Sequence, residues 1–239
     1  VAEQFAWRRA YIVGGVIGLL LLVLRVGTFE SGIFKSTVSG KVSRGNLSLL
    51  FNNKERFLRY LYCLLIGLPI WFVVGIFVTL APEFGKALGA PVPLSAGKGI
   101  LFCYLGISLG DLLAGLLAQM TKSRKLAVFI FQLGIIVSSV LYLSSTGITE
   151  SRFNWLSFFM GLGVGYWATF VTIASEQFGT NIRATVTTTA PNFVRGALIP
   201  STLLFEFILA KTNILTAGYI MIFILTAIAV FALTRLRES

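Results

Sequence analysis

Seven apolar stretches, each about 20 residues long, constrain the fold of this chain more than any other feature. Their approximate limits are 9–28, 58–80, 98–119, 126–146, 154–174, 186–209 and 213–234. A helix of about 20 residues crosses about 30 Å of hydrocarbon, and lipid offers no water to satisfy an open backbone. Because no alternating apolar pattern competes with this interpretation, the sequence predicts an all-α, polytopic membrane protein with about seven transmembrane helices.

The composition agrees with lipid as the main solvent of the chain. Its 239 residues are 56% hydrophobic and only 12% charged, about half the charged fraction of an ordinary soluble domain. The net charge of +11 would also suit a nucleic-acid binder, but such a protein clusters its cations on one solvated face. Here the cations lie in short segments between apolar stretches, as in loops that face an anionic leaflet. We therefore expect a lipid bilayer as partner, and no nucleic acid.

Several classes of site are disfavoured by residue type. The chain has no histidine, and its two cysteines, Cys63 and Cys103, lie inside apolar stretches as packing residues rather than as a disulfide. No paired acids, serine–histidine pair or deep lysine base can be placed at one depth, so we expect no metal, no cofactor and no enzyme. Every lysine lies in a loop or at the edge of a span, which disfavours a retinal protein.

The cations divide unequally between the two sides of such a chain. One side would hold eleven of them: Lys35, Lys41, Arg44, Lys54, Arg56, Lys122, Arg124, Lys125, Arg183, Arg235 and Arg237. The other side would hold six: Arg8, Arg9, Lys86, Lys98, Arg152 and Lys211. Because cytoplasmic loops carry the excess of lysine and arginine, we assign the first side to the cytoplasm. The prediction is a multi-pass protein of the cytoplasmic (plasma) membrane.

Two opposite charges lie deep inside predicted spans. Asp111 lies eight residues before the end of its span, about 12 Å from the cytoplasmic face. Arg195 lies nine residues into a span that runs the opposite way, about 13–14 Å from the same face. Each charge alone would cost roughly 2.5–3.5 kcal/mol at a helix centre, so each is expected to face the bundle interior or water.

Polar residues recur at helical intervals around both charges. They are Tyr104, Ser108, Asp111 and Gly115 on one span, and Thr188, Asn192 and Arg195 on the other. One interpretation is a polar cavity in which Asp111 and Arg195 contact a solute or a coupling proton. The alternative is that the two charges hold helices together, directly or through backbone groups.

Small residues and prolines add expectations about helix packing. Glycines four residues apart let membrane helices approach closely, and three pairs qualify: Gly14–Gly18, Gly106–Gly110 and Gly161–Gly165. Prolines inside a span bend it, and here they are Pro69, Pro191 and Pro200.

Four segments carry a resemblance to a known family. They are "WRRAYIVGGVIGL" followed by "FESGIF", "GLLAQMTKSRK" at 115–125, "SEQFGTNIRAT" at 175–185, and "PNFVRGALIP". In this order they resemble the major facilitator superfamily, chiefly its sugar-porter-like and metabolite:proton symporter members. The second segment resembles the loop motif Gly-x-Leu-Ala-Asp-x-x-Gly-Arg-Arg/Lys, from which Gln119 and Lys122 depart. The third keeps the seven-residue spacing from Glu176 to Arg183.

The resemblance implies a domain organisation. Residues 1–28 would be the sixth transmembrane helix, 29–57 a cytoplasmic linker between halves, and 58–239 the C-terminal six-helix bundle of a twelve-helix transporter. Because the chain starts at Val1 in mid-pattern, we expect it to be part of a longer protein. Its partner would then be the missing N-terminal half of the same transporter.

The resemblance also implies a function and its residues. The function would be secondary active transport of a small solute by alternating access, with a proton as candidate coupling ion. A non-transporting structural or receptor-like membrane subunit is the alternative. Candidates for the substrate or proton pathway are Asp111, Arg195, Asn192, Tyr166, Trp167 and Trp71. Candidates for a cytoplasmic gate are Glu30, Arg124, Lys125, Glu176 and Arg183, with Glu176 expected to pair with Arg124 or Lys125.

A structural role without a part in transport remains an alternative for both the pathway candidates and the gate candidates. Aromatic residues in membrane helices more often serve packing or the interface belt than a ligand. The gate charges can equally be ordinary loop charges that follow the positive-inside bias.

Overall fold

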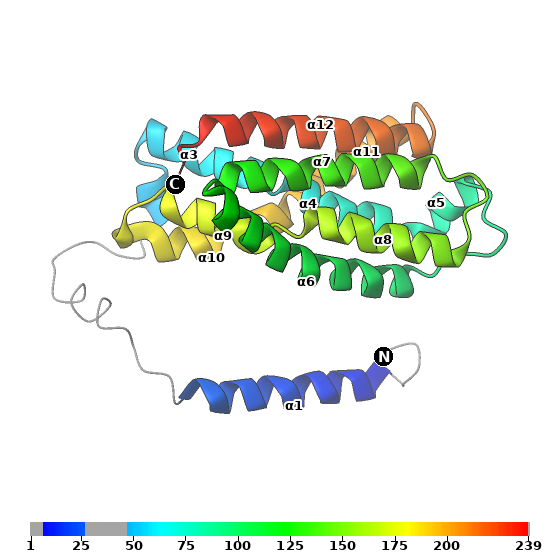
Figure 1. Ribbon diagram of the computed structural model, residues 1–239, viewed down its shortest axis with the longest axis horizontal. Helices are drawn as coiled ribbons and strands as arrows, with labels where there is room; N and C mark the ends of the chain where they lie inside the picture. Colours follow the sequence, from blue (N-terminus) through cyan, green and yellow to red (C-terminus); the bar gives the residue numbers. More distant parts are fainter. Residues whose placement is uncertain (1–6, 27–46, 239) are drawn as a thin grey trace. The chain divides into compact units, whose positions relative to one another are not determined.

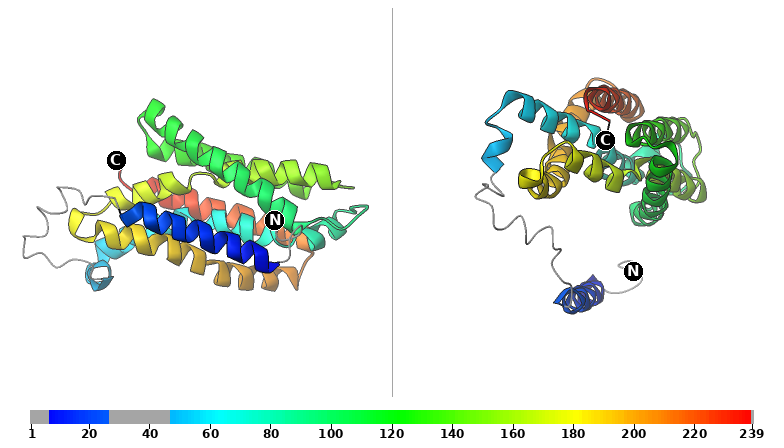
Figure 2. Two further views of the ribbon diagram at one scale, coloured as in Figure 1. Left: turned by 90° about the horizontal axis from the view of Figure 1, so that it is seen from below. Right: turned by 60° about the vertical axis from the view of Figure 1, so that its left-hand side comes forward.

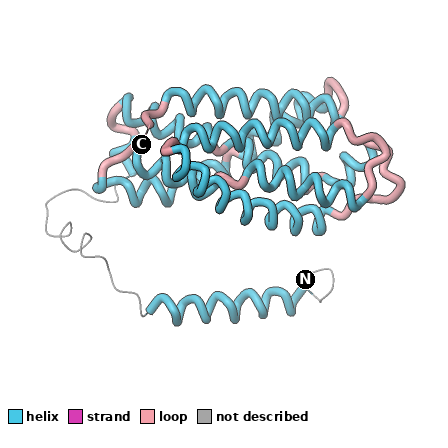
Figure 3. Tube along the Cα trace, viewed as in Figure 1, coloured by secondary structure: helices cyan, strands magenta, loops and turns pink. Residues whose placement is uncertain are grey.

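The computed structural model describes residues 7–26 and 47–238, which form helices and loops without a strand (Figure 3). The chain divides into two units, residues 1–43 and residues 44–239. The first unit contains α1 (Trp7–Val26), whose apolar stretch Tyr11–Arg25 is shorter than the other candidate spans. The expected gate residue Glu30 and most of the expected linker lie outside the described residues.

The second unit contains six helical stretches that are long and apolar enough to cross a membrane (Figure 1). They are Lys54–Val78, Ala96–Thr121, Arg124–Leu143, Glu150–Glu176, Thr180–Leu209 and Ile214–Arg235. The limits fall within four residues of the predicted ones, except that the fifth of these spans begins at Thr180, six residues before the predicted start. The predicted fold class, an all-helical polytopic membrane protein, is therefore confirmed.

Three of these stretches are unbroken helices and three are built from shorter pieces. The unbroken ones are α6 (Ala96–Thr121), α7 (Arg124–Leu143) and α12 (Ile214–Arg235). The composite ones are α3 (Lys54–Ile66) with α4 (Leu68–Phe72) and η2 (Val73–Val78), α8 (Glu150–Val164) with α9 (Trp167–Glu176), and α10 (Thr180–Gly196) with α11 (Leu198–Leu209). Two short elements complete the unit, η1 (Leu47–Leu50) and α5 (Ala81–Ala87).

Polar caps explain where the long helices begin. A side-chain oxygen at the N-cap accepts a backbone N–H that the first turn leaves unpaired. The residues that do this are Asn53, Ser95, Ser123, Thr149 and Asn213. The prolines coincide with interruptions: Pro69 opens α4 after Gly67, and α10 gives way to α11 between Pro191 and Pro200.

The helices of the second unit run side by side, with α6 crossing α8 and with α12 lying against α3 and α7 (Figures 1 and 2). α9 and α10 pack on each other and on α3. A chain of aromatic rings fills the core, in which Phe77 meets Phe72, Phe84 and Tyr142 at centroid distances of 5.1, 5.4 and 6.0 Å. Such ring pairs contribute about 0.5–1.5 kcal/mol each beyond the area that they bury.

Glycines set the distance between α6 and α8. A Cβ added at Gly106 would overlap the backbone of Phe158, and one added at Gly161 would overlap the backbone of Cys103. Gly110 and Gly165 meet in the same way, since a Cβ added at either residue would lie only 2.5–2.8 Å from the Cα of the other. Two of the three expected glycine pairs therefore bring helix backbones into direct contact, and the third, Gly14–Gly18, lies in the first unit.

Candidate functional site

The span Glu150–Glu176 is interrupted near its middle. α8 ends at Val164 with Gly165 as its cap, and α9 begins at Trp167, after Tyr166. Gly165 presses against Gly110 of α6, and the buried Tyr166 donates from its hydroxyl to the Ile66 carbonyl, 2.9 Å away. Tyr166 thus fixes the break against the end of α3, and the first turn of α9 leaves amide groups without a partner inside the helix.

Asp111 satisfies one of these amide groups. Its Oδ1 accepts a hydrogen bond of 2.8 Å from the backbone N–H of Ala168, in the first turn of α9. No side chain of the α9 segment itself supplies a cap at this end. A carboxylate at a helix N-terminus is stabilised by the unpaired N–H groups and by the helix dipole. The deep acid therefore ties α6 to α9 through a backbone group.

Arg195 reaches the same break from α10. Its guanidinium carbon lies 5.3 Å from the ring centroid of Trp71 and 5.6 Å from that of Trp167. The two indoles meet edge to face at 5.9 Å, and Arg195 also donates from Nη1 to the Asn192 Oδ1 at 3.3 Å. We call Arg195, Asn192, Trp71 and Trp167 the arginine–indole cluster. A guanidinium over the face of an indole is attracted by the negative face of the ring.

The two deep charges approach consecutive residues of α9 without pairing with each other. Asp111 holds the amide of Ala168, whereas Arg195 lies over the ring of Trp167. Among the residues that the structure describes, no ion pair joins Asp111 to Arg195. Four of the six predicted pathway residues nevertheless gather around a fifth, Trp167, and the sixth, Tyr166, is its chain neighbour.

A cavity of about 430 Å³ runs from Asp111 toward the end of α6. Its lining combines α6, the start of α7 and α9: Asp111, Gly115, Ala118, Gln119, Lys122, Arg124, Ala168, Thr169 and Thr172. Asp111 and Gly115 belong to the predicted polar stripe, and their half-buried side of α6 lines this cavity. The other stripe, Thr188, Asn192 and Arg195, is exposed along α10.

Arg124 of α7, which lines this cavity, forms an ion pair with Glu176 of α9. Of the two partners expected for Glu176, the structure selects Arg124. Lys125 instead donates from Nζ to the Leu236 carbonyl at 3.0 Å, and Arg183 donates from Nε to the Ser175 carbonyl at 3.1 Å. We call this end of the unit, where α6 ends and α7 begins, the basic end.

The C-terminal tail takes part in the basic end, which the sequence did not indicate. Glu238 accepts from the Ser123 hydroxyl at 2.9 Å. Gln177 exchanges two hydrogen bonds with the backbone of Arg237, at 3.0 and 3.4 Å. The tail therefore joins the α6–α7 turn to the end of α9.

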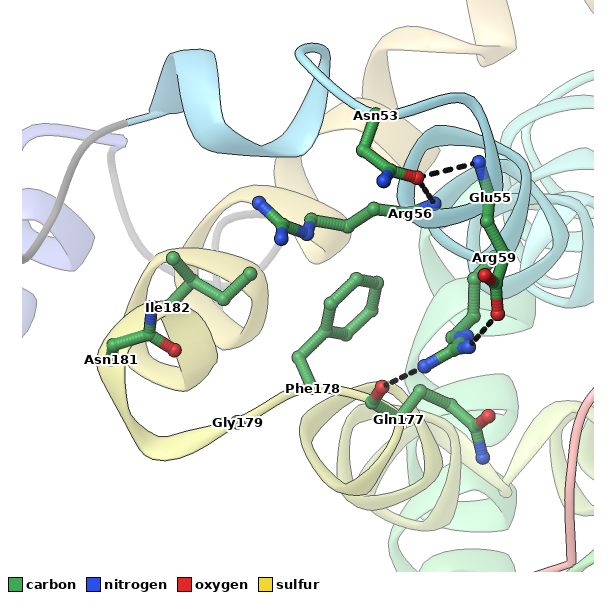
Figure 4. A pocket seen from close by; sticks show the side chains of 9 residues that line it. All are labelled: Asn53, Glu55, Arg56, Arg59, Gln177, Phe178, Gly179, Asn181 and Ile182. Carbon is green, nitrogen blue, oxygen red and sulfur yellow. Dashed lines mark hydrogen bonds and ion pairs between the residues drawn. The ribbon is translucent and has the colours of Figure 1, made fainter.

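A second pocket, of about 270 Å³, lies beside this network between the start of α3 and the α9–α10 turn (Figure 4). Arg59 bridges its wall, donating from Nη1 to the Gln177 carbonyl at 3.1 Å and pairing through Nη2 with Glu55 at 2.6 Å. Arg56 and Phe178 line the same pocket. These contacts hold α3 and α9 together at the basic end.

At the opposite end of the unit, an ion pair joins α6 to α8. Lys98 near the start of α6 pairs with Glu150 at the start of α8, with 3.0 Å between Nζ and Oε1. Both side chains remain substantially exposed.

A comparison with protein families shows to which family this chain belongs. The family model described as the Major Facilitator Superfamily matches residues 1–200. The chain belongs to the Major Facilitator Superfamily. The comparisons with curated proteins and with solved structures give no match.

Membership in the Major Facilitator Superfamily fixes the general function. Its members carry small solutes across the lipid bilayer, so the chain is that of a multi-pass integral membrane protein of the transporter class. The sugar-porter-like subtype expected from the sequence is not established by the match.

Proposed function

We propose that this chain forms the C-terminal half of a secondary transporter that moves a small solute by alternating access in the plasma membrane. In this proposal residues 1–28 are the sixth transmembrane helix, and 29–57 link the halves. The basic end faces the cytoplasm. The observation that carries the proposal is the cavity from Asp111 to the Arg124–Glu176 pair, because it joins a mid-membrane charge to a closable end.

The exposure of the two spans that carry the deep charges supports a second helical bundle packed against them. In the span Thr180–Leu209 only 11% of the most apolar window is buried, and in Ala96–Thr121 only 22%, the two lowest shares of the six. These two spans also carry Arg195 and Asp111, which are too costly to leave against lipid. Their exposed faces therefore suit contact with a second helical bundle across a water-filled site, as alternating access requires.

The Arg124–Glu176 pair has the properties of a gate. Its side chains are 31% and 29% exposed, so the pair lies near water. An ion pair that water can reach contributes only about 0–1 kcal/mol, which lets it open in each cycle. We assign Arg124, Glu176, Lys125 and Arg183 to this gate, and Glu30 to its contact with the other half.

Asp111 is the proposed site of proton coupling. Its carboxylate lines the cavity and holds the N-terminus of α9, so protonation would remove the charge that the helix dipole attracts. Loss of this charge would loosen the tie between α6 and α9. Proton binding would thereby act on the same helix whose far end carries Glu176 of the gate.

The experiment compares Asp111→Asn with Asp111→Ala in the complete protein reconstituted in proteoliposomes. Asparagine keeps an oxygen for the Ala168 amide but cannot carry a proton, whereas alanine loses both. We expect Asp111→Asn to abolish uptake driven by a pH gradient and to retain solute counterflow. We expect Asp111→Ala also to lower stability, by about 0.5–2 kcal/mol for a lost cap.

Uptake by Asp111→Asn that still follows the pH gradient would contradict the coupling role. Absence of any counterflow by the wild-type protein, across sugars, carboxylates and phosphate esters, would contradict the transport proposal itself.

A further inference from the structure

The charge balance around Arg195 points to the chemical class of the solute. Among the described residues, the ion pairs are Arg59–Glu55, Arg237–Glu55, Lys98–Glu150 and Arg124–Glu176. Arg195 has no acid in this set, although it lies well inside the span Thr180–Leu209. The other deep charge, Asp111, is directed to the Ala168 amide.

An arginine at membrane depth needs a counter-charge or water. The partners that the structure gives to Arg195 are two indole rings and one amide oxygen, none of which carries a full negative charge. They orient the guanidinium and leave its charge uncompensated. Because Arg195 is exposed on the face that carries the polar stripe, a bound solute can supply the missing anion.

We propose that the arginine–indole cluster binds a small organic monocarboxylate, an inference that rests on the transport function proposed above. The planar guanidinium matches a carboxylate through two parallel hydrogen bonds. The indoles of Trp71 and Trp167 border the same position and offer apolar surface to the body of the solute. The indole N–H of Trp71 is buried without an acceptor among the described residues, so the cluster also holds an unfilled donor.

The single positive charge of Arg195 favours a monoanion over a neutral sugar or a dianionic phosphate ester. A neutral sugar would leave the charge of Arg195 uncompensated, and a dianionic phosphate ester would bring one negative charge too many. Asp111 of α6 accepts from the amide of Ala168, the α9 residue next to Trp167, and would repel the second charge of a dianion. The cations Lys122 and Arg124 line the far part of the cavity, and Arg124 is already paired with Glu176.

The test measures thermal stabilisation of the complete purified protein by matched solutes. One set is glucose, gluconate and glucose 6-phosphate, and the other is cyclohexanecarboxylate with its amide, cyclohexanecarboxamide. We expect at least one carboxylate to raise the melting temperature, while the neutral member of its set has no effect. Arg195→Gln should remove this shift, and Arg195→Lys should retain part of it because lysine keeps the charge without the planar fork.

Controls separate the site from general effects of charge and folding. Arg152→Gln removes an exposed cation at the opposite end of α8 and should leave the carboxylate shift unchanged. Each variant is first required to elute as a monodisperse species, and Arg195→Lys serves where Arg195→Gln does not fold. Equal stabilisation by a carboxylate and its amide, or a carboxylate shift that persists in Arg195→Gln, overturns the inference. So does a panel without any stabilising carboxylate.

Two different outcomes distinguish a wrong solute class from a wrong transport proposal. Counterflow of a neutral sugar that is insensitive to Arg195→Gln overturns the monocarboxylate class and leaves transport intact. Carboxylate binding that depends on Arg195, without counterflow of that carboxylate, supports the site and counts against transport.

Discussion

Two regions of the second unit hold their helices together in opposite ways. Between α6 and α8, four glycines bring the backbones into direct contact, so that no side chain can intervene. Where α9 meets α6 and α7, single polar contacts join the helices, Asp111 to Ala168 and Arg124 to Glu176. Backbone contact resists deformation because packed interiors tolerate little change in volume. Polar contacts near water can be exchanged, so α6 with α8 forms the fixed part and α9 the adjustable one.

The largest effect is expected from breaking the fixed region. Gly106→Val and Gly161→Val place side-chain atoms on the backbone of the facing helix, at Phe158 and Cys103. Overpacking of a core typically costs about 1–3 kcal/mol, and here the obstacle is backbone that cannot rotate away. We expect both variants to lose the monodisperse peak in size-exclusion chromatography, or to melt at a clearly lower temperature.

Gly115→Ala is the matched control on the same helix. A Cβ at Gly115 meets no atom within 4 Å, and alanine is the better helix former by about 1 kcal/mol. It should be at least as stable as the wild type. If Gly161→Val were as stable as Gly115→Ala, backbone contact between α6 and α8 would not make this region the more rigid of the two.

A smaller effect is expected from breaking the gate pair Arg124–Glu176. It should change how readily a reagent reaches the cavity, rather than the stability of the fold. Thr172 lines the cavity behind the Arg124–Glu176 pair, and both native cysteines are buried. In a Thr172→Cys background, Glu176→Gln should raise the rate of alkylation by N-ethylmaleimide several-fold. The double exchange Arg124→Glu with Glu176→Arg should restore the slower rate, because the attraction is restored.

Glu83→Gln, on an exposed acid near the start of α5, is the control for loss of one negative charge. A labelling rate that is the same in Glu176→Gln and in the wild type would mean that the pair does not close the cavity.

The sequence predicted most of the fixed framework and only part of the adjustable one. The spans could be found because each needs about 20 apolar residues, and polar caps such as Ser95 and Ser123 mark their starts. Helical periodicity placed Asp111 and Arg195 on two polar stripes, of which Asp111 and Gly115 line the cavity and the Arg195 stripe is exposed. The break at Gly165 carries no proline, and Gly110 of another helix approaches it closely. The bonds of Gln177 to Arg237 join residues sixty positions apart, which no local pattern indicates.

The smallest effect is expected at the end opposite the gate, where Lys98 pairs with Glu150. Their side chains are 51% and 34% exposed, so the attraction is screened by water and salt. Lys98→Gln should change the melting temperature by an amount near the error of measurement, corresponding to about 0–1 kcal/mol, and this change should shrink further in high salt. Lys86→Gln, which removes an exposed cation from α5, provides the reference for loss of charge alone. Because glycine contacts already fix α6 against α8, this ion pair adds little to an interface that is closed without it. A large destabilisation by Lys98→Gln would show that the α6–α8 contact depends on its polar end as much as on its glycines.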